Sequence, residues 1–476
     1  MHDVIIVGSG PGGSSAASFL ARAGADVLLL DRSEFPREKV CGDGLAPQAI
    51  YWCDRLGCID EVLEQTSGAI HCCDLFVNGR KLLTSGFPSS TIYPEFAVLL
   101  DRRRFDDTLR RNAIAHGAKF LPSSRVHAIE RDAQGVTVKA RTPEGEQSFS
   151  ARIVIGADGV SSTVSRAIGN VLKEGVMAIS VRAYFKGVRI SGAPLRIYFD
   201  RAYFPGYAWL FVDDKGVANV GLGYASDPTF PAVGNLRALF ESFLAKELGA
   251  ELTGATRCGG VSGGSAAFYR PRRICDDRVM LVGDAANQPD PLNGGGIHKA
   301  MEGAWLAAET ALEALRTGDC SATTLSRYDR LWREHAERDW QTAEMFLTFA
   351  KNPHVRDLCL FGVEQLGALT RTDARFNGFC AGVFSGVVSQ SLCLSPNTLY
   401  GVLPKTWAPW ARFLEANGGA GAPARLSVRA LAVAAAAAAG IFRHPLPNID
   451  WSLEVATKAL RLADRQVASW GAAITS

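Results

Sequence analysis

The chain has 476 residues, of which 47 % are hydrophobic and 48 are glycine, a composition typical of folded α/β proteins that excludes a disordered chain. Its 51 basic and 48 acidic side chains leave a formal net charge of +3, which excludes an overall field for nucleic acid or an acidic partner. A chain of this length predicts two or three domains that share a cofactor.

The first residues of the chain have the pattern of a βαβ unit. A buried strand is expected over residues 3–7, a helix over 14–22 and a second strand over 27–31. The chain runs directly into the first strand, so neither a signal peptide nor a transit peptide is expected. The turn between this strand and the helix is where a dinucleotide-binding loop belongs.

That turn contains Gly8, Gly10 and Gly13 in the spacing G-x-G-x-x-G. Gly8 permits the tight turn, Gly10 lets the backbone approach a pyrophosphate, and Gly13 lets helix and strand pack closely. The helix start offers free N–H groups to the phosphates, and Asp31 ends the second strand, where an acid can accept hydrogen bonds from ribose hydroxyls. The loop predicts a dinucleotide site, and by itself it does not distinguish FAD from NAD.

The next elements indicate a second domain inserted in the first. A helix over 105–116 and strands over 136–140 and 151–155 continue the nucleotide-binding pattern. Between residues 178 and 268, β-branched and aromatic runs indicate an antiparallel sheet, with strands over 178–185, 195–199 and 217–223. A strand over 278–282 and a long helix over 297–315 then resume the first domain.

The C-terminal part is expected to be mainly helical, with breaks at Pro353, Pro396, Pro404 and residues 418–423. The apolar stretch 426–442 is mostly alanine and falls short of a membrane span, so it is expected to be a buried or surface-lying helix. Peripheral contact of this helix with a bilayer stays open.

We therefore expect an α/β fold with a Rossmann-type FAD-binding domain, an inserted antiparallel-sheet domain and a helical C-terminal region. The first domain is assigned to residues 1–75, 100–175 and 270–325. The inserted domain, which would bind the substrate, is assigned to 76–99 and 176–269, and the C-terminal domain to 326–476.

A second glycine-rich loop favours FAD over NAD. Gly283 and Asp284 follow the strand 278–282 and precede residues 294–296, three glycines that open the long helix. An Asp at the carboxyl end of a strand can bind the hydroxyls of a ribityl chain, which FAD has and NAD lacks. The helix start points N–H groups at the N1/C2 carbonyl region of a flavin, where negative charge develops on reduction.

These loops, together with Gly156-Ala-Asp158-Gly159, resemble the p-hydroxybenzoate hydroxylase-like flavoprotein fold. Within it the chain resembles the geranylgeranyl reductase family. Residues 37–47 (REKVCGDGLAP) resemble the flavin-facing loop of that family, 205–211 (PGYAWLF) its substrate-domain signature, and 291–297 (PLNGGGI) its helix-entry loop.

The resemblance implies a tightly held, non-covalent FAD and no metal. The residues that it assigns to cofactor binding are Gly8, Gly10, Pro11, Gly12, Gly13, Asp31, Arg32, Lys39, Cys41, Gly42, Arg102, Val126, Asp158, Gly159, Gly283, Asp284, Pro291, Gly294, Gly295, Gly296 and Ile297.

The same resemblance places Cys41 beside the isoalloxazine ring. Its thiol, tuned by Lys39 and loop N–H groups, could donate a proton, or it could pack against the flavin as a small apolar group. Arg102 resembles an arginine that closes over the cofactor; the alternative is a solvated basic turn with Arg103 and Arg104.

Tyr207, Trp209 and Phe211 alternate along an expected strand, so their side chains share one face. This face could wall an apolar substrate, which would make Tyr207 and Trp209 active-site residues beside Cys41, or it could be ordinary sheet core. His298 is expected to be a cap or surface residue rather than an acid–base group.

The resemblance implies an FAD-dependent oxidoreductase that reduces carbon–carbon double bonds of an isoprenoid or other long apolar substrate by hydride from flavin N5. The alternatives are a flavin-dependent monooxygenase acting on an aromatic or carrier-bound substrate of secondary metabolism, and a non-catalytic flavin-binding or lipid-binding module. Halogenation is not expected, because the sequence lacks the W-x-W-x-I-P stretch of flavin-dependent halogenases.

Electrons are expected from NAD(P)H or from a partner reductase. Residues 259–264 are glycine-rich but lack the strand–helix context of a second dinucleotide loop. The eleven cysteines have no metal-ligand spacing, so a reducing cytoplasm is the expected location, with membrane association left open. The sequence leaves the oligomeric state open.

Overall fold

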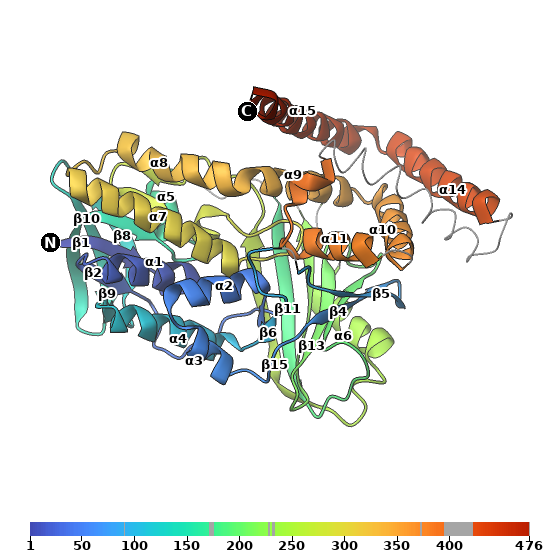
Figure 1. Cartoon of the computed structure of the whole chain (residues 1–476), viewed down its shortest axis with the longest axis horizontal. Coiled ribbons are helices and arrows are strands. Elements are labelled where there is room, and N and C mark those ends of the chain that lie inside the picture. The colour runs from blue at the N-terminus through green and yellow to red at the C-terminus, as the bar shows by residue number, and fades with distance from the viewer. Residues whose placement is uncertain are drawn as a thin grey trace.

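The described residues form two large sheets, side by side, and a separate two-stranded pair, with helices packed around the first sheet and a helical layer over one edge of the molecule (Figure 1). The computed structural model describes residues 1–89, 91–170, 176–226, 229–230, 234–371, 374–394 and 422–475. The predicted combination of a parallel-rich nucleotide-binding sheet, an antiparallel sheet and a helical C-terminal region is confirmed.

The first sheet has the strand order β16-β17-β10-β1-β2-β7, and the β8–β9 hairpin extends it from β10. Its central strands are parallel, so their carboxyl ends share one edge. The strands are β1 (His2–Val7), β2 (Val27–Leu30), β7 (Lys119–Leu121), β8 (Arg125–Arg131), β9 (Val136–Thr142), β10 (Gly145–Gly156), β16 (Cys275–Asp276) and β17 (Val279–Leu281).

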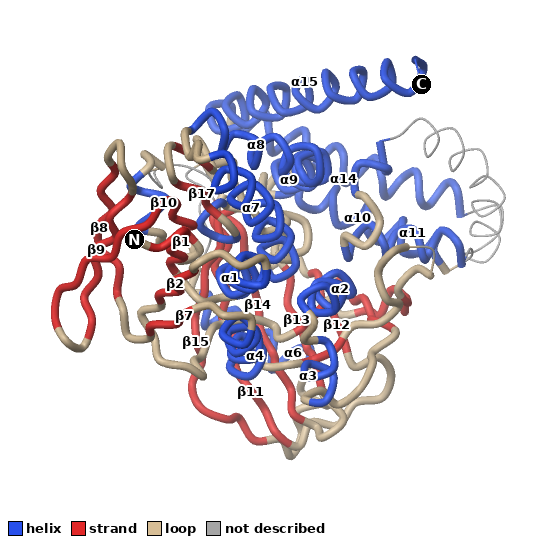
Figure 2. Tube along the Cα trace, turned by 60° about the vertical axis from the view of Figure 1, so that its left-hand side comes forward, coloured by secondary structure: helices blue, strands red, loops and turns tan. Residues whose placement is uncertain are grey.

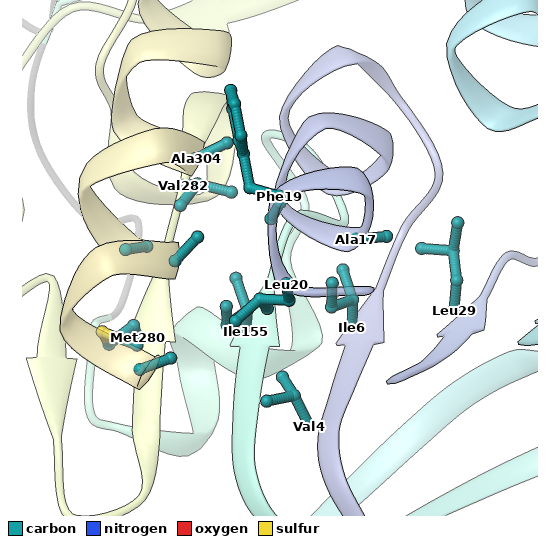
Figure 3. Packing of buried hydrophobic residues seen from close by; sticks show 14 of the residues in the cluster. Val4, Ile6, Ala17, Phe19, Leu20, Leu29, Ile155, Met280, Val282 and Ala304 are labelled. Atoms are coloured by element: carbon teal, nitrogen blue, oxygen red, sulfur yellow. The ribbon is translucent and has the colours of Figure 1, made fainter. Parts of the chain in front are cut away.

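The central strands β1, β2 and β17 of this sheet are apolar and mostly buried because helices cover the sheet. Helix α1 packs between α4 and α7, and its Phe19 and Leu20 meet Val4, Ile6 and Ala304 in the core (Figure 3). The helices of this part are α1 (Pro11–Arg22), α2 (Pro47–Leu56), α3 (Ile59–Glu64), α4 (Arg102–Ala115), α5 (Thr163–Ala167), α7 (Ile297–Thr317) and α8 (Ala322–Trp332), with the 3-10 turn η1 (Gly283–Ala286).

Two helices start earlier than their apolar spacing predicts. Helix α4 begins at Arg102 rather than at residue 105, because the Asp101 side chain caps it by accepting a hydrogen bond from the Arg104 N–H at 3.1 Å. Helix α1 begins at Pro11, whose fixed φ suits the first position of a helix.

The second sheet has the order β15-β11-β14-β13-β12-β4-β5 and is antiparallel except between β12 and β4. Helix α6 (Leu236–Glu247) covers one face, where Ala208, Leu210 and Val212 are buried. The strands are β4 (Cys72–Val77), β5 (Arg80–Gly86), β11 (Met177–Lys186), β12 (Leu195–Phe199), β13 (Tyr207–Val212), β14 (Val217–Ser226) and β15 (Thr256–Ala267); a short pair, β3 (Gly44–Leu45) and β6 (Val98–Leu99), stands apart.

Residues 259–264 lie inside strand β15, so they form no second dinucleotide loop. The domain boundaries given above stay a prediction; the pairing of β4 with β12 shows that strand residues from before position 76 also belong to the second sheet.

The C-terminal region is helical where the structure describes it. Its elements are the π-helical turn η2 (Arg333–Glu337), α9 (Arg338–Ala350), α10 (Arg356–Thr370), α11 (Ala374–Ser385), η3 (Gln390–Leu394), α14 (Ala422–Arg443) and α15 (Pro445–Thr475). Pro353 separates α9 from α10. Pro396, Pro404 and residues 418–421 lie outside the described residues. Figure 2 shows α15 running along the outer surface above α8 and α9.

Candidate active site

A cavity of about 970 Å³ lies between the two sheets and the long loops that join them. Its walls come from the β1–α1 loop, residues 37–42, the β13 strand, η1 and the entry to α7. All the cofactor and catalytic residues predicted above line it except Gly13 and Gly295. The fold thus brings distant stretches of the sequence to one place at the carboxyl edge of the first sheet.

Gly13 and Gly295 do not line the cavity, and each allows a close approach that a Cβ atom would prevent. A Cβ on Gly13 would lie 1.8 Å from the carbonyl oxygen of Gly8, so this glycine allows α1 to pack against β1. A Cβ on Gly295 would lie 2.6 Å from both Asn293 Oδ1 and His298 Cε1, inside the helix-entry loop.

One end of the cavity fits a dinucleotide pyrophosphate. Gly8 has a φ of +99°, and the nearest atom to a Cβ placed on Gly10 is Arg37 Nη2 at 3.6 Å, so the backbone at Gly10 is open to the cavity. Helix α1 has no side-chain cap and no acid in its first turn, which leaves its N-terminal N–H groups for an anion. Arg37 adds a positive charge at the same place.

Asp31 lies between this loop and the second strand. Its Oδ2 accepts a hydrogen bond from the Ser9 N–H at 2.7 Å and its Oδ1 accepts one from the Ser33 N–H at 2.8 Å. The carboxylate is therefore fixed at the cavity wall, with Arg32 and Val126 nearby in the lining, where an adenosine ribose would lie in this fold.

The opposite end of the cavity fits a flavin. Lys39 Nζ lies 3.1 Å from Asp284 Oδ2, which joins the loop of residues 37–42 to η1. Helix α7 starts at Ile297, its N-cap residue Gly296 provides no side-chain cap, and both residues line the cavity. The uncapped helix start suits a flavin ring, which gains negative charge on reduction. The Asp284 carboxylate suits a polyhydroxyl chain, whose hydroxyls can donate hydrogen bonds to it.

Asp158 and Gly159 also line the cavity, but the Asp158 carboxylate is held by protein. It accepts hydrogen bonds from Ser162 Oγ and from the Thr163 N–H, at 2.6 Å for the latter, so it caps the start of α5. Its contribution to the site is to fix the turn after β10.

Cys41 lies near the buried Arg102 and near Tyr207. The Arg102 guanidinium contacts Cys41 and forms two hydrogen bonds of 2.7 Å with the carboxylate of Asp106. Burial alone would lower the pKa of Arg102, yet Asp106 and Cys41 together raise it, so the guanidinium stays charged. Burial and the nearby Cys41 raise the pKa of Tyr207.

This geometry corrects one alternative and one expectation. Arg102 is 5 % exposed, so it is no part of a solvated basic turn with Arg103 and Arg104. His298 is 5 % exposed rather than a surface residue, and burial lowers its pKa to about 3. In the part of the chain that the structure describes, its Nε2 has no hydrogen-bond partner. The long helix turns this position inward, which residue type alone did not indicate.

Tyr207 and Trp209 stand on the face of β13 that looks away from α6, and both line the cavity. Tyr207 donates a hydrogen bond to the Asn293 carbonyl oxygen at 2.6 Å, which ties β13 to the helix-entry loop. A Cβ on Gly42 would lie 3.0 Å from the Phe211 ring, so that glycine lets the Cys41 loop lie against this aromatic face.

Asn219 connects three parts of the site. It accepts a hydrogen bond from Trp209 Nε1 at 2.9 Å, and its Nδ2 donates to the Cys41 carbonyl oxygen at 2.8 Å and to Asp43 Oδ2 at 2.7 Å. Tyr184 donates a second hydrogen bond to Asp43 Oδ2. Asp43 is buried, which raises its pKa to about 6 even though both hydrogen bonds lower it.

Four residues of this site were not predicted as site residues: Arg37, Asp43, Asp106 and Asn219. The spacing of Arg102 and Asp106, four apart on a helix, is a signal for an ion pair that could have found Asp106. Asp43 stands within the motif of residues 37–47 and Asn219 within the expected strand 217–223, but their pairing across 176 positions has no local signal.

The fold, the uncapped helix starts and the cavity define a flavoprotein oxidoreductase. A family model described as an FAD binding domain matches residues 1–219. The chain is similar to the menaquinone reductase of Mycolicibacterium smegmatis, with 30 % identity over 72 % of this chain and 82 % of that protein. It is also similar to digeranylgeranylglycerophospholipid reductase 2 of Methanopyrus kandleri, with 32 % identity over 72 % of this chain and 84 % of that protein.

Among solved structures, the fold is similar to that of a geranylgeranyl bacteriochlorophyll reductase-like protein from Thermoplasma acidophilum. The TM-score is 0.66 with 24 % identity, covering 77 % of this chain and 91 % of that one. The chain belongs to the geranylgeranyl reductase family of FAD-dependent oxidoreductases, within the p-hydroxybenzoate hydroxylase-like fold.

Proposed function

We propose that this protein reduces carbon–carbon double bonds in the isoprenoid chain of a lipid or of another long apolar molecule. The observation that carries the proposal is the position of Cys41, at the point where the flavin end of the cavity meets the aromatic face of β13. The similar proteins named as menaquinone reductase and digeranylgeranylglycerophospholipid reductase support this substrate class.

The cavity wall beyond Cys41 suits an apolar chain. Besides Tyr207 and Trp209 it includes other apolar side chains of the second sheet, of the residue that follows β15 and of α9: Ala178, Ile179, Ala225, Phe268 and Leu347. Such a wall gains free energy from the burial of a hydrocarbon chain and keeps water away from the reacting carbons.

FAD, which the loops of residues 8–12 and 283–297 would hold in the cavity, would supply the hydride for one carbon of the double bond when bound. The Cys41 thiol donates the proton to the other carbon, with the charged Arg102 guanidinium beside it. Asp106 holds Arg102 in place, and Asn219 holds the Cys41 carbonyl oxygen. A proton from solvent then restores the thiol.

The electrons are proposed to come from NAD(P)H that binds transiently or from a partner reductase. Both sources agree with the place of the glycine-rich stretch 259–264, which is part of strand β15 and forms no second nucleotide-binding loop.

The function is tested by oxygen-free re-oxidation of the flavin. Protein reduced with dithionite is mixed with a geranylgeranyl glycerol ether lipid or with its fully saturated counterpart, and absorbance near 450 nm is followed. We expect the flavin to re-oxidise with the unsaturated lipid alone. A quinone is avoided as the probe because its ring would itself accept the electrons.

Two results would contradict the proposal. If neither lipid re-oxidises the flavin without oxygen, while oxygen and an aromatic substrate together do, the protein is a monooxygenase. If the purified protein takes up no FAD, the flavin site itself is misassigned.

A further inference from the structure

The largest exposed apolar side chains of the C-terminal region gather on two helices. Those of α14 and α15 that are more than half exposed are Val428, Leu431, Phe442, Leu446, Ile449, Leu453 and Leu460, from 54 % exposed at Ile449 to 84 % at Phe442. Scattered exposed apolar residues are normal on a protein surface, but large apolar side chains concentrated on two neighbouring helices indicate an interaction surface.

The sequence spacing of these exposed side chains shows that they form one stripe along α14 and another along α15. On α15 the exposed residues Leu446, Ile449, Leu453 and Leu460 recur at intervals that keep them on one face. The opposite face of α15 carries Trp451 and Leu462, which are buried. On α14, Val428, Leu431 and Phe442 likewise lie on one face of the helix, and exposed alanines stand between them in the sequence.

The packed face of α15 explains why the stripe is left outside. Trp451 Nε1 donates a hydrogen bond to the Thr348 carbonyl oxygen of α9 at 2.8 Å, and the Trp451 ring meets Phe349 edge to face. Lys351 Nζ of the α9 C-cap lies 2.6 Å from Glu454 Oε2. Helix α15 is therefore oriented by its polar and aromatic face, and the leucine stripe has no place in the protein core. Figure 1 shows both helices on the outer side of the molecule.

This region also carries a net positive charge. Residues 422–475 contain six basic and three acidic side chains, a net charge of +3, which equals the net charge of the whole protein. The exposed Arg461 of α15 lines a small hollow together with Arg270 and Arg272. A basic surface beside an apolar stripe complements an anionic lipid surface.

No single helix among the described residues is long and apolar enough to cross a bilayer. The pair Val428–Arg443 and Pro445–Ala463 reaches that length and hydropathy only when its two helices are taken together, and it is bent by 112°. Amphipathic helices of this kind lie in the interface, with the apolar face in the acyl boundary and the basic side chains among the headgroups.

We propose that the exposed stripes of α14 and α15, the α14–α15 face, dock this protein onto the surface of an anionic lipid bilayer. The inference stands independently of the reaction. It also places the cavity close to the membrane, because Leu347 of α9 lines the cavity while the next residues of α9 pack against α15.

A second copy of this chain fits the face less well. In a twofold dimer the same surface meets itself, so the basic side chains of one copy would lie near those of the other and repel them. A lipid headgroup layer of opposite charge removes that repulsion.

The test uses the full-length, FAD-loaded protein and vesicles of phosphatidylcholine, with or without an equal amount of phosphatidylglycerol. Flotation should recover the wild type with the anionic vesicles and much less with the neutral ones. The double variant Leu453→Gln and Leu460→Gln should bind anionic vesicles roughly tenfold more weakly or worse, since it removes apolar area from the interface.

The matched control is Ile92→Gln with Ile114→Gln, two exposed apolar residues outside these helices, and it should float like the wild type. Flavin absorbance and melting temperature verify that each variant is folded. Equal flotation of the wild type and the Leu453→Gln/Leu460→Gln variant overturns the proposal. So does a wild-type dimer in light scattering that the variant loses while vesicles bind neither protein, which would assign the face to a second copy.

Discussion

Replacing Cys41 with serine is expected to slow the reduction of substrate by roughly 10²–10⁴-fold, the contribution typical of a general acid. A serine hydroxyl is a much weaker acid than a thiol, so it donates a proton to the reacting carbon far less readily. Serine is only slightly smaller than cysteine, so the cavity shape should be kept. FAD occupancy and flavin reduction by dithionite should therefore be unchanged.

The rate is measured by single-turnover mixing of pre-reduced protein with the unsaturated lipid under anaerobic conditions. Cys258→Ser is the matched control, because Cys258 is a free thiol on β15 that does not line the cavity. If the Cys41→Ser flavin re-oxidises as fast as the wild type, Cys41 packs against the flavin and the proton has another source.

Asp43→Asn is expected to raise stability relative to the wild type, and only at neutral or higher pH. The folded pKa of Asp43 is about 6, above the ordinary value of 3.8, because burial disfavours its carboxylate. In the part of the chain that the structure describes, Asp43 Oδ1 has no hydrogen-bond partner. The stability that the neutral acid contributes is present in full below the unfolded pKa and is lost as the pH rises through about 6.

Asparagine keeps the shape of the protonated acid, can accept the hydrogen bonds from Tyr184 and Asn219, and tolerates the positive φ of 62° at this position. The variant and the wild type should be similarly stable near pH 4.5. At pH 8 the variant should be more stable by roughly 2 kcal/mol, the value that follows from this pKa shift over that pH range.

Urea unfolding at the two pH values measures the difference, with Asp54→Asn, an exposed position on α2, as the control. A stability difference that does not change between pH 4.5 and pH 8 would show that Asp43 is ionised in the folded protein over that whole range.

Local patterns were sufficient for the fold and for much of the lining of the cavity. The apolar runs of β1, β2 and β17 are buried strands because helices cover the sheet, and their apolar composition alone indicates this burial. The glycine loop and the α7 entry were found because turn geometry restricts the residue types that fit, as the 1.8 Å approach at Gly13 shows.

The connections between those segments could not be predicted in the same way. The bonds from Asn219 to Cys41 and to Asp43 join β14 to a loop far away in the sequence, and they depend on how the second sheet sits against the first. The burial of His298 depends likewise on the rotation of α7, which the first two positions of a helix do not determine. The run of three arginines left a solvated turn open as the alternative for Arg102, and the ion pair with Asp106 that accompanies its burial was not predicted.

The central claim is that the flavin reduces a carbon–carbon double bond of an apolar substrate, and the mass of the product tests it most directly. Dithionite-reduced protein is incubated without oxygen with a geranylgeranyl glycerol ether lipid, and the lipid is extracted for mass spectrometry. The account predicts a product heavier by two hydrogen atoms for each bond reduced, formed by the wild type and nearly lost in Cys41→Ser. A lipid of unchanged mass without oxygen, or a product that gains an oxygen atom once air is admitted, would contradict it.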